Sequence, residues 1–258
     1  MVLTSDGIEA LNHEWVALEP QAILTAAFER YGVSEIAVSF SGAEDIALVD
    51  MATRLRPDVR VFTLDTGRLF PETYAFFEAA RTHYGIEIEV YSPETEAVET
   101  LVRTKGFFSF FGDGHGECCQ IRKVEPLRRA LSSVQAWITG QRRDQSPETR
   151  TEIPVVQIDP TFRADSGPLV KFNPLASWTS AQVFAYLTQH KTPLHPLHHR
   201  LVQNGGDYHT LTAPSYVSLG CQPCTSLLNP GEHERAARWR WESSDKKECG
   251  LHLGNTKG

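Results

Sequence analysis

Five cysteines are the residues of this sequence best suited to chemistry. Cys118 and Cys119 are adjacent, Cys221 and Cys224 form a C-x-x-C pair, and Cys249 stands apart near the C-terminal end. Four thiolates in two pairs suit a tetrahedral zinc ion or an iron–sulfur cluster of the 4Fe-4S kind. Neighbours on a helix point about 100° apart, which crowds one zinc ion but reaches two irons of a larger cluster. The spacing favours a cluster, with a zinc site and a redox-active Cys221–Cys224 disulfide as alternatives.

The segment Ser39-Phe-Ser-Gly-Ala-Glu-Asp45 is a second chemical signal. It is typical of a strand end, a tight turn at Gly42 and a helix start, where unpaired N–H groups and the helix dipole attract a phosphate or sulfate. An ordinary helix start with acidic residues in its first turn has the same composition, so both interpretations stay open. The segment lacks the lysine of a Walker loop, which argues against a P-loop nucleoside triphosphatase.

Several arginines could hold an anionic ligand. Arg235 and Arg238 are three residues apart, so we expect them to share one face of a helix, and Arg150 lies near a predicted loop. Guanidinium groups pair with oxyanions in a bidentate fashion. The alternative is an exposed, charged helix in which Glu232 and Glu234 balance the arginines.

The elements that must position these residues alternate between strands and helices. Repeated strand–loop–helix units predict one α/β domain with a central, mainly parallel sheet flanked by helices, and ligands of such sheets bind at the carboxyl ends of the strands. The predicted strands are 35–40, 59–64, 86–91, 135–139, 155–158 and 169–172, and the predicted helices lie within 7–31, 43–55, 71–84, 118–131 and 177–190.

Length and charge restrict the class of protein. The chain has 258 residues, is 41% hydrophobic and carries a formal net charge of -7, which argues against a general nucleic-acid or membrane-surface binder. No apolar run reaches the roughly 18 residues of a membrane span, and the first ten residues do not resemble a signal peptide, so we expect a cytoplasmic protein. We expect residues 1–240 to form the domain and residues 241–258 a mobile tail that carries Cys249.

Taken together, these residues resemble the assimilatory adenylyl-sulfate reductases of the PP-loop, or adenine nucleotide α-hydrolase-like, superfamily. One matching segment would be weak evidence, whereas six in the family's order are specific and span most of the chain from about residue 35 to 252. The matching segments are Ser39–Asp45, Leu64–Tyr74, Cys118–Leu127, Ile138–Ser146, Cys221–Cys224 and Glu248–His252.

The resemblance implies a reaction and a set of site residues. Cys249 would attack the sulfur of adenosine 5'-phosphosulfate, release AMP and become S-sulfocysteine, and thioredoxin, an external dithiol protein, would then free sulfite. Cys118, Cys119, Cys221 and Cys224 would bind a 4Fe-4S cluster, with Lys123 between cluster and substrate. The other substrate-binding residues implied are Ser39, Ser41, Gly42, Asp45, Leu64, Asp65, Gly140, Arg150, Arg235, Arg238 and His252.

Three other functions are considered. Reductases confined to the 3'-phosphorylated nucleotide, PAPS, typically lack the two cysteine pairs, although some cluster-bearing relatives accept both nucleotides. PP-loop enzymes that adenylate tRNA or a small acid usually carry Ser-Gly-Gly-x-Asp-Ser, whereas Ala43 and Glu44 follow the glycine here. A nucleotide-binding sensor would not need Cys249. The sequence also leaves a homo-oligomer open.

Overall fold

A mixed β-sheet forms the centre of the computed structural model, which describes residues 5–147 and 149–243. Within these residues the sheet has six strands in the order β3-β2-β1-β4-β6-β5. Neighbouring strands run parallel, except that β5 is antiparallel to β6. The strands are β1 (Ile36–Ser39), β2 (Arg60–Leu64), β3 (Ile88–Tyr91), β4 (Ala136–Ile138), β5 (Val156–Ala164) and β6 (Gly167–Phe172). The predicted α/β fold with a mainly parallel sheet is confirmed.

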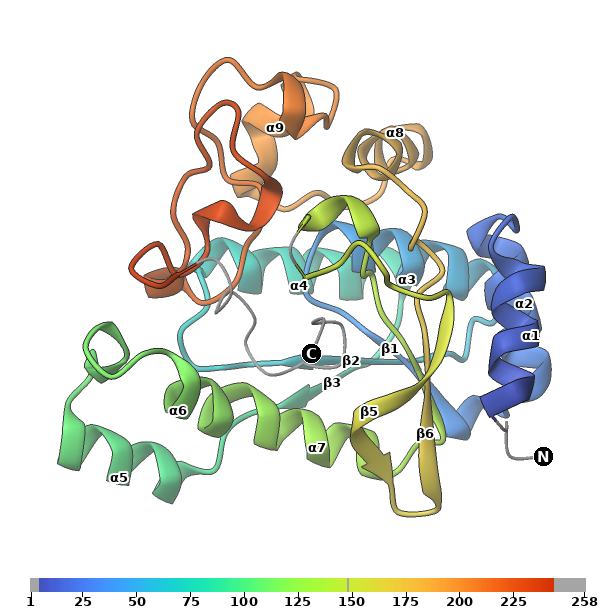
Figure 1. Ribbon diagram of the computed structural model, residues 1–258, viewed down its shortest axis with the longest axis horizontal. Helices are drawn as coiled ribbons and strands as arrows, with labels where there is room; N and C mark the ends of the chain where they lie inside the picture. The colour runs from blue at the N-terminus through green and yellow to red at the C-terminus, as the bar shows by residue number, and fades with distance from the viewer. Residues whose placement is uncertain (1–4, 148, 244–258) are drawn as a thin grey trace.

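Helices cover both faces of the sheet (Figure 1). Helices α3, α4 and α8 lie on one face, α6 and α7 lie on the other, and α1 and α2 stand near the β5–β6 end. The helices are α1 (Ser5–Trp15), α2 (Pro20–Arg30), α3 (Ala43–Leu55), α4 (Pro71–Tyr84), α5 (Thr95–Lys105), α6 (Gly116–Cys119), α7 (Glu125–Ser132), α8 (Ser180–His190) and α9 (His199–Gln203). No helix within the described ranges is both long and apolar enough to cross a membrane.

Local sequence explains where the helices nearest the strand ends begin and stop. Helix α3 follows Gly42 and has Glu44 and Asp45 in its first turn, where negative charge complements the helix dipole. Helix α4 begins at Pro71, whose fixed φ suits a first helical position, and ends at Gly85 in the left-handed conformation with φ of 63°. Both helices have the predicted bounds.

Two helical regions differ from their predictions. The predicted opening at 7–31 is two helices separated before Pro20, because proline is tolerated at a helix start but not in its interior. The predicted helix at 118–131 is continuous, but Gln120–Val124 form a π-helical turn between α6 and α7. Helix α5 was not predicted.

The strand order places a crevice between β1 and β4. The connections from β1 run outward to β2 and β3, whereas β4 and β6 lie on the other side, so the order reverses at the β1–β4 pair. Ligands of open α/β sheets bind outside the carboxyl ends of strands at such a point. The loop after β1 and the loop after β4 therefore face each other across this edge.

Helix α3 should contribute strongly to stability through its buried face. Leu48 is fully buried in the core, whereas Leu55 on the same helix is 39% exposed. We expect Leu48→Ala to lower the free energy of unfolding in urea by about 2 to 5 kcal/mol, because it removes buried methyl groups and leaves a cavity. Leu55→Ala is the matched control, and equal losses in the two variants would contradict this account.

Candidate functional site

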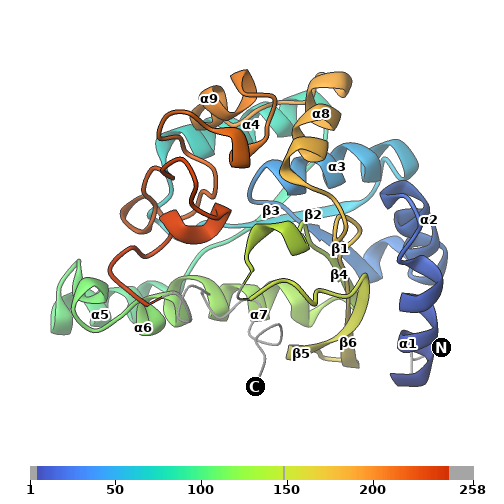
Figure 2. The same cartoon turned by 45° about the horizontal axis from the view of Figure 1, so that its top comes forward.

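A cavity lies at the carboxyl ends of β1, β2 and β4. Its walls come from the loops after these strands and from the segment 217–239, which runs between the α4 side and the α6 side of the molecule (Figure 2). Asp65 does not line the cavity; its carboxylate instead accepts hydrogen bonds from the Gly67 N–H and the Tyr74 hydroxyl at 2.8 and 2.7 Å. The predicted substrate residues that line it are Ser39, Ser41, Gly42, Asp45, Leu64, Lys123, Gly140, Arg150, Arg235 and Arg238.

Asp45 ties the loop after β1 to the loop after β4. Its carboxylate accepts hydrogen bonds from the Ser41 N–H and hydroxyl at 2.8 and 2.7 Å and from the Gly140 N–H at 3.0 Å. Position 140 must be glycine, because a Cβ there would lie 2.4 Å from Glu44 Cβ and 2.5 Å from Asp45 Oδ1. Burial, with a smaller contribution from the Glu44 charge, raises the pKa of Asp45 to about 6 despite these hydrogen bonds.

Four cations surround the cavity, and the Trp239 ring lies among three of them. Lys123, Arg150, Arg235 and Arg238 are each less than a tenth exposed. The Arg238 guanidinium lies 4.5 Å from the Trp239 ring centre, Arg235 lies 5.9 Å away and the Lys123 ammonium 6.0 Å away. An aromatic face attracts cations, so this buried ring holds positive charge at one side of the cavity.

Arg238 has one guanidinium nitrogen without a protein partner. Its Nε donates to the Cys224 carbonyl at 3.2 Å and its Nη1 to the Leu219 carbonyl at 3.1 Å. Buried Nη2 has no hydrogen-bond partner among the described residues. Gly220 permits this placement, because a Cβ there would lie 2.3 Å from Nη2. A buried donor beside a cavity is suited to an anionic ligand.

The prediction that Arg235 and Arg238 share a helix face is wrong. Residues Glu234–Ala237 form a short 3₁₀ turn, and Arg238 follows in extended conformation with φ of -90° and ψ of 137°. The Arg238 N–H donates to the Arg235 carbonyl at 3.0 Å, and the helix does not continue because Arg238 pairs with Thr225 in an isolated antiparallel bridge. Both arginines nevertheless line the cavity, because the turn and the bridge direct them to the same side.

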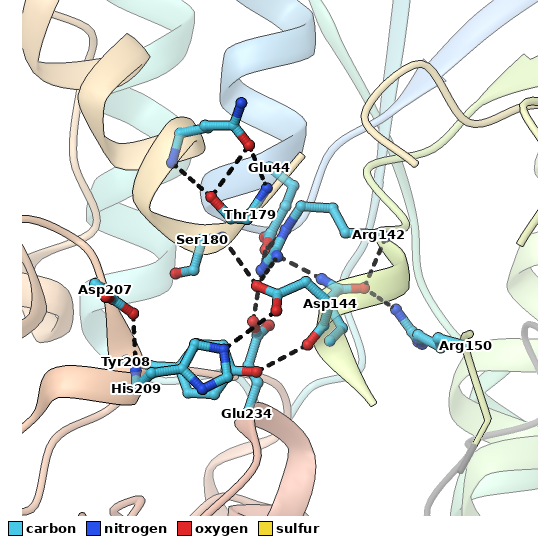
Figure 3. Close-up of polar contacts among 12 residues, drawn as sticks. Glu44, Arg142, Asp144, Arg150, Thr179, Ser180, Asp207, Tyr208, His209 and Glu234 are labelled. Carbon is cyan, nitrogen blue, oxygen red and sulfur yellow. Dashed lines mark hydrogen bonds and ion pairs between the residues drawn. The ribbon is translucent and has the colours of Figure 1, made fainter. Parts of the chain in front are cut away.

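Arg142 joins three acidic residues from separate parts of the chain (Figure 3). Its guanidinium, 1% exposed, lies 2.8 Å from Glu44, 3.0 Å from Asp144 and 2.5 Å from Glu234. Glu44 lies in the first turn of α3, Arg142 and Asp144 lie after β4, and Glu234 lies beside Arg235 in the C-terminal segment. The guanidinium thus connects the two strand-end loops to the segment that carries the cavity arginines.

The pKa values of the two glutamates in this network are shifted in opposite directions. Burial raises the pKa of Glu234, and the nearby Glu44 charge adds to the rise, whereas Arg142 opposes it. For Glu44 the Arg142 charge and hydrogen bond outweigh burial, and the pKa of that carboxyl is lowered. A single buried guanidinium cannot compensate every carboxylate around it, so the pKa of Glu234 is raised while that of Glu44 is lowered.

The two cysteine pairs are close together in the structure. Cys119, Cys221 and Cys224 are buried with Phe110 and Trp239 in one cluster, and partly buried Cys118 packs against it. All four are free thiols. Within the described part of the chain, no group of three or more Cys, His, Asp and Glu side chains is arranged to hold a single metal ion.

The surroundings of these thiols are cationic. Burial alone would raise the pKa of Cys221, but the Lys123 charge, the Thr66 hydroxyl at 3.2 Å from Sγ and two arginines together lower it. Four thiols among Lys123, Arg122, Arg238 and Arg68 are a donor set that suits an anionic iron–sulfur group. The residues present therefore fit the cluster that the sequence predicts.

Several residues of the cavity were not predicted as site residues. The sequence marks Trp239 only as an aromatic residue next to Arg238, and it points to Glu234 only through the alternative of an exposed, charged helix. Arg142, which contacts the wall residues Glu44 and Glu234, was not predicted either, and it is buried whereas the adjacent Arg143 is not. Arg143 is half-buried, and its Nε donates to the Ile153 carbonyl at 2.9 Å instead of meeting the cavity. Cys249 and His252 lie outside the described residues.

Comparison with known proteins identifies the family. Residues 35–227 match the model of the phosphoadenosine phosphosulfate reductase domain, which is most of the chain. The chain belongs to this reductase family. It is 53% identical over 236 residues to the adenosine 5'-phosphosulfate reductase of Pseudomonas aeruginosa strain LESB58, covering 92% of this chain and 83% of that protein.

Other members of the phosphosulfate reductase family agree with this placement. The chain is 49% identical to 5'-adenylylsulfate reductase 1, chloroplastic, of Arabidopsis thaliana over 99% of its own length, and it spans 52% of that longer protein. The crystal structure of the Candida auris phosphoadenylyl-sulfate reductase superposes with a TM-score of 0.66 at 26% identity, covering 88% of this chain and 99% of that one. The predicted membership is confirmed.

The buried Asp45 carboxyl should make stability depend on pH. The folded protein keeps a proton on Asp45 up to about pH 6, whereas an unfolded aspartate loses it near pH 4. The folded state binds more protons between these values, so its stability falls as the pH rises. The free energy of unfolding of wild type minus that of Asp45→Asn should therefore fall by on the order of 2 kcal/mol from pH 4 to pH 6. A difference that stays constant across this range would contradict the assignment, and exposed Asp58→Asn is the control variant.

Replacing Arg142 should destabilise the fold in a pH-dependent way. Arg142→Met leaves Glu44, Asp144 and Glu234 without their shared cation, and removing one partner of a buried ion pair costs about 3 to 5 kcal/mol. Urea unfolding at pH 8 should show this loss, and at pH 5 it should be smaller because the carboxyls take up protons. Arg81→Met is the control, since its pair with Glu78 is exposed. Similar unfolding midpoints for both variants at pH 8 would refute the role of Arg142.

Proposed function

We propose that this chain reduces adenosine 5'-phosphosulfate to sulfite and AMP in sulfate assimilation. The single observation that carries the proposal is the partnerless Nη2 of buried Arg238 in a cavity that also collects Lys123, Arg150 and Arg235. Such a site suits a ligand with two adjacent anionic groups, because several fixed cations can pair with both. The names of the Pseudomonas and Arabidopsis relatives support adenylyl sulfate as that ligand.

The loops around the cavity supply the remaining contacts in this proposal. The N-terminal end of α3, with Ser41 and Gly42, would receive an anionic group of the phosphosulfate. Gly140, which carries no side chain, would let the adenine approach the loop after β4. Asp45 would keep both loops in place through its hydrogen bonds to Ser41 and Gly140 without contacting the sulfate.

We assign the chemistry to Cys249, which lies outside the described residues. Its thiolate attacks the sulfate sulfur, the bond from that sulfur to the phosphate oxygen breaks, and AMP leaves with the electron pair. The enzyme then carries S-sulfocysteine. In this proposal residues 1–240 form the nucleotide-binding domain and residues 241–258 the tail that brings Cys249, with His252 beside it, to the cavity. The tail starts from a fixed point, because Trp241 and Glu242 are held by the body of the protein.

A dithiol protein, thioredoxin, would complete the reaction. One thiolate of the dithiol attacks Cys249 Sγ, a disulfide forms, and sulfite leaves with the electron pair of the broken sulfur–sulfur bond. The second thiol attacks the mixed disulfide, which releases the Cys249 thiolate and the oxidised partner. The dithiol supplies both electrons, so the sulfur is reduced without any other reductant.

We further propose that Cys118, Cys119, Cys221 and Cys224 hold a 4Fe-4S cluster. When bound, the cluster would supply a compact anionic group beside the cavity. Lys123 lines the cavity and also lowers the pKa of the Cys221 thiol by its charge. Its ammonium can therefore pair with thiolate and substrate oxygen at once, and Trp239 limits where it moves. The cluster's role here is electrostatic and structural.

Intact mass measurement tests the nucleophile. Anaerobically purified, cluster-replete protein should gain the mass of one SO3 group when mixed with adenylyl sulfate without reductant, because the intermediate cannot be released. Cys249→Ser should gain nothing, since a hydroxyl is a far weaker nucleophile than a thiolate.

The same assay run with PAPS separates the two nucleotides. We expect the adduct to form faster with adenylyl sulfate, as the relatives at about half identity carry that substrate in their names. An unmodified wild-type protein that still contains its iron and sulfide would exclude the thiosulfonate route.

A further inference from the structure

Three phenylalanine side chains are exposed on the turn that precedes the first cysteine pair. Phe107 is 65% exposed, Phe108 is 63% exposed and Phe111 is 50% exposed. Phe108 and Phe111 stack with ring centres 6.2 Å apart, so they present one continuous apolar surface, here termed the phenylalanine patch together with Phe107. Contiguous exposed apolar surface marks sites of interaction with other proteins.

The phenylalanine patch is held in place by the body of the protein. Phe110, at the centre of the turn Ser109–Phe111, is buried, and the Arg68 guanidinium lies 5.0 Å from its ring. Arg68 also donates a hydrogen bond to the Phe107 carbonyl. On the other side Trp241 lies 4.5 Å from the Phe111 ring and donates through Nε1 to the Phe110 carbonyl at 3.2 Å. The turn is therefore fixed between two anchors, which preorganises the exposed rings.

The segment that carries Cys249 begins next to the phenylalanine patch, at Trp241 and Glu242. Glu242 accepts hydrogen bonds from the backbone N–H of His115 and contacts its Nδ1, both at 2.7 Å, and His115 stacks on Trp239 at 4.3 Å. Both side chains are nearly buried, so they fix the position of residue 242. Cys249 follows seven residues later, and even a fully extended chain places it within about 25 Å of Glu242.

Two ligands must reach Cys249 in turn under the proposed function. The nucleotide binds in the cavity, and none of Phe107, Phe108 and Phe111 lines that cavity. The dithiol protein needs a surface of its own within reach of Cys249, and transient redox contacts of this kind bury less than roughly 1,200 Å² in total. The phenylalanine patch lies beside the start of the Cys249 segment, and half or more of each of its three side chains stays exposed.

We propose that the phenylalanine patch is the docking surface for the dithiol protein that reduces the Cys249 adduct, an inference that rests on the proposed function. The partner must carry an apolar rim around its reactive thiol. Lys105 beside the patch already pairs with Glu117 at 2.6 Å and with Asp113 at 3.5 Å, so its charge is compensated within the protein and apolar burial drives the contact. Residues 244–258 offer only Leu251 and Leu253 as large apolar side chains to cover three phenylalanines.

The two half-reactions allow a separate test of this surface. The variant Phe107→Ser/Phe108→Ser/Phe111→Ser should form the SO3 adduct at the wild-type rate, and dithiothreitol should release sulfite from it at the wild-type rate. Release by thioredoxin should show a KM increased roughly tenfold or more, because truncated apolar anchors weaken docking. Val90→Ser is the matched control, since Val90 is 60% exposed on β3 away from the patch.

Other outcomes would overturn the proposal. An unchanged KM for thioredoxin would show that the partner binds elsewhere. Equal slowing with thioredoxin and dithiothreitol, or slower adduct formation, would show that the phenylalanine patch supports the Cys249 segment instead. Loss of self-association in sedimentation with an unchanged KM would assign it to a second copy of this chain.

Two measurements keep the test interpretable. If the triple variant folds poorly, Phe107→Ser alone replaces a side chain whose ring is mostly in solvent, and the same thioredoxin-specific increase in KM is expected. If wild-type protein forms no adduct, the proposed function itself is contradicted, and this outcome does not depend on the phenylalanine patch. The two failures are therefore distinguishable.

Discussion

The buried Arg142 guanidinium is the interaction on which the site depends. It contacts Glu44 at the start of α3, Asp144 after β4 and Glu234 in the C-terminal segment, so one cation connects three regions that share no secondary structure. A buried charge is stable only when it is paired and hydrogen-bonded, and these contacts meet that condition. The cavity arginines next to Glu234 owe their positions to this network, which itself makes no contact that requires a ligand.

A second constraint is the accumulation of like charge. Lys123, Arg150, Arg235 and Arg238 line one cavity in a protein whose net charge is -7, and their mutual repulsion must be offset. Trp239 offers its ring face to three of them, and Glu44 and Glu234 stand at the cavity wall. The cavity therefore presents positive charge to an anionic ligand, although the net charge of the protein is negative.

The cysteine cluster and the start of the Cys249 segment use the same supports. Trp239 packs with Cys119, Cys221 and Cys224, and its other contact, His115, holds Glu242. Any group bound by the cysteines therefore lies next to the point from which the proposed nucleophile extends. Trp239 thus links the anion cavity to the thiols, and Phe110 of the same cluster connects them to the phenylalanine patch through its contact with Phe111.

Much of this protein could be read from its sequence because the signals are local. Apolar strands, Gly42 before an acidic helix start, Pro71 and the paired cysteines predict the parallel sheet, its ligand edge and a four-thiol site, since backbone preferences and side-chain chemistry act over a few residues. Long-range packing decided the rest. Arg142 and Arg143 are adjacent arginines in the sequence, and only the fold buries the first of them. Arg235 and Arg238 converge through a 3₁₀ turn and a bridge to Thr225 instead of a helix. Such placements depend on which distant segments meet, and no local preference encodes that meeting.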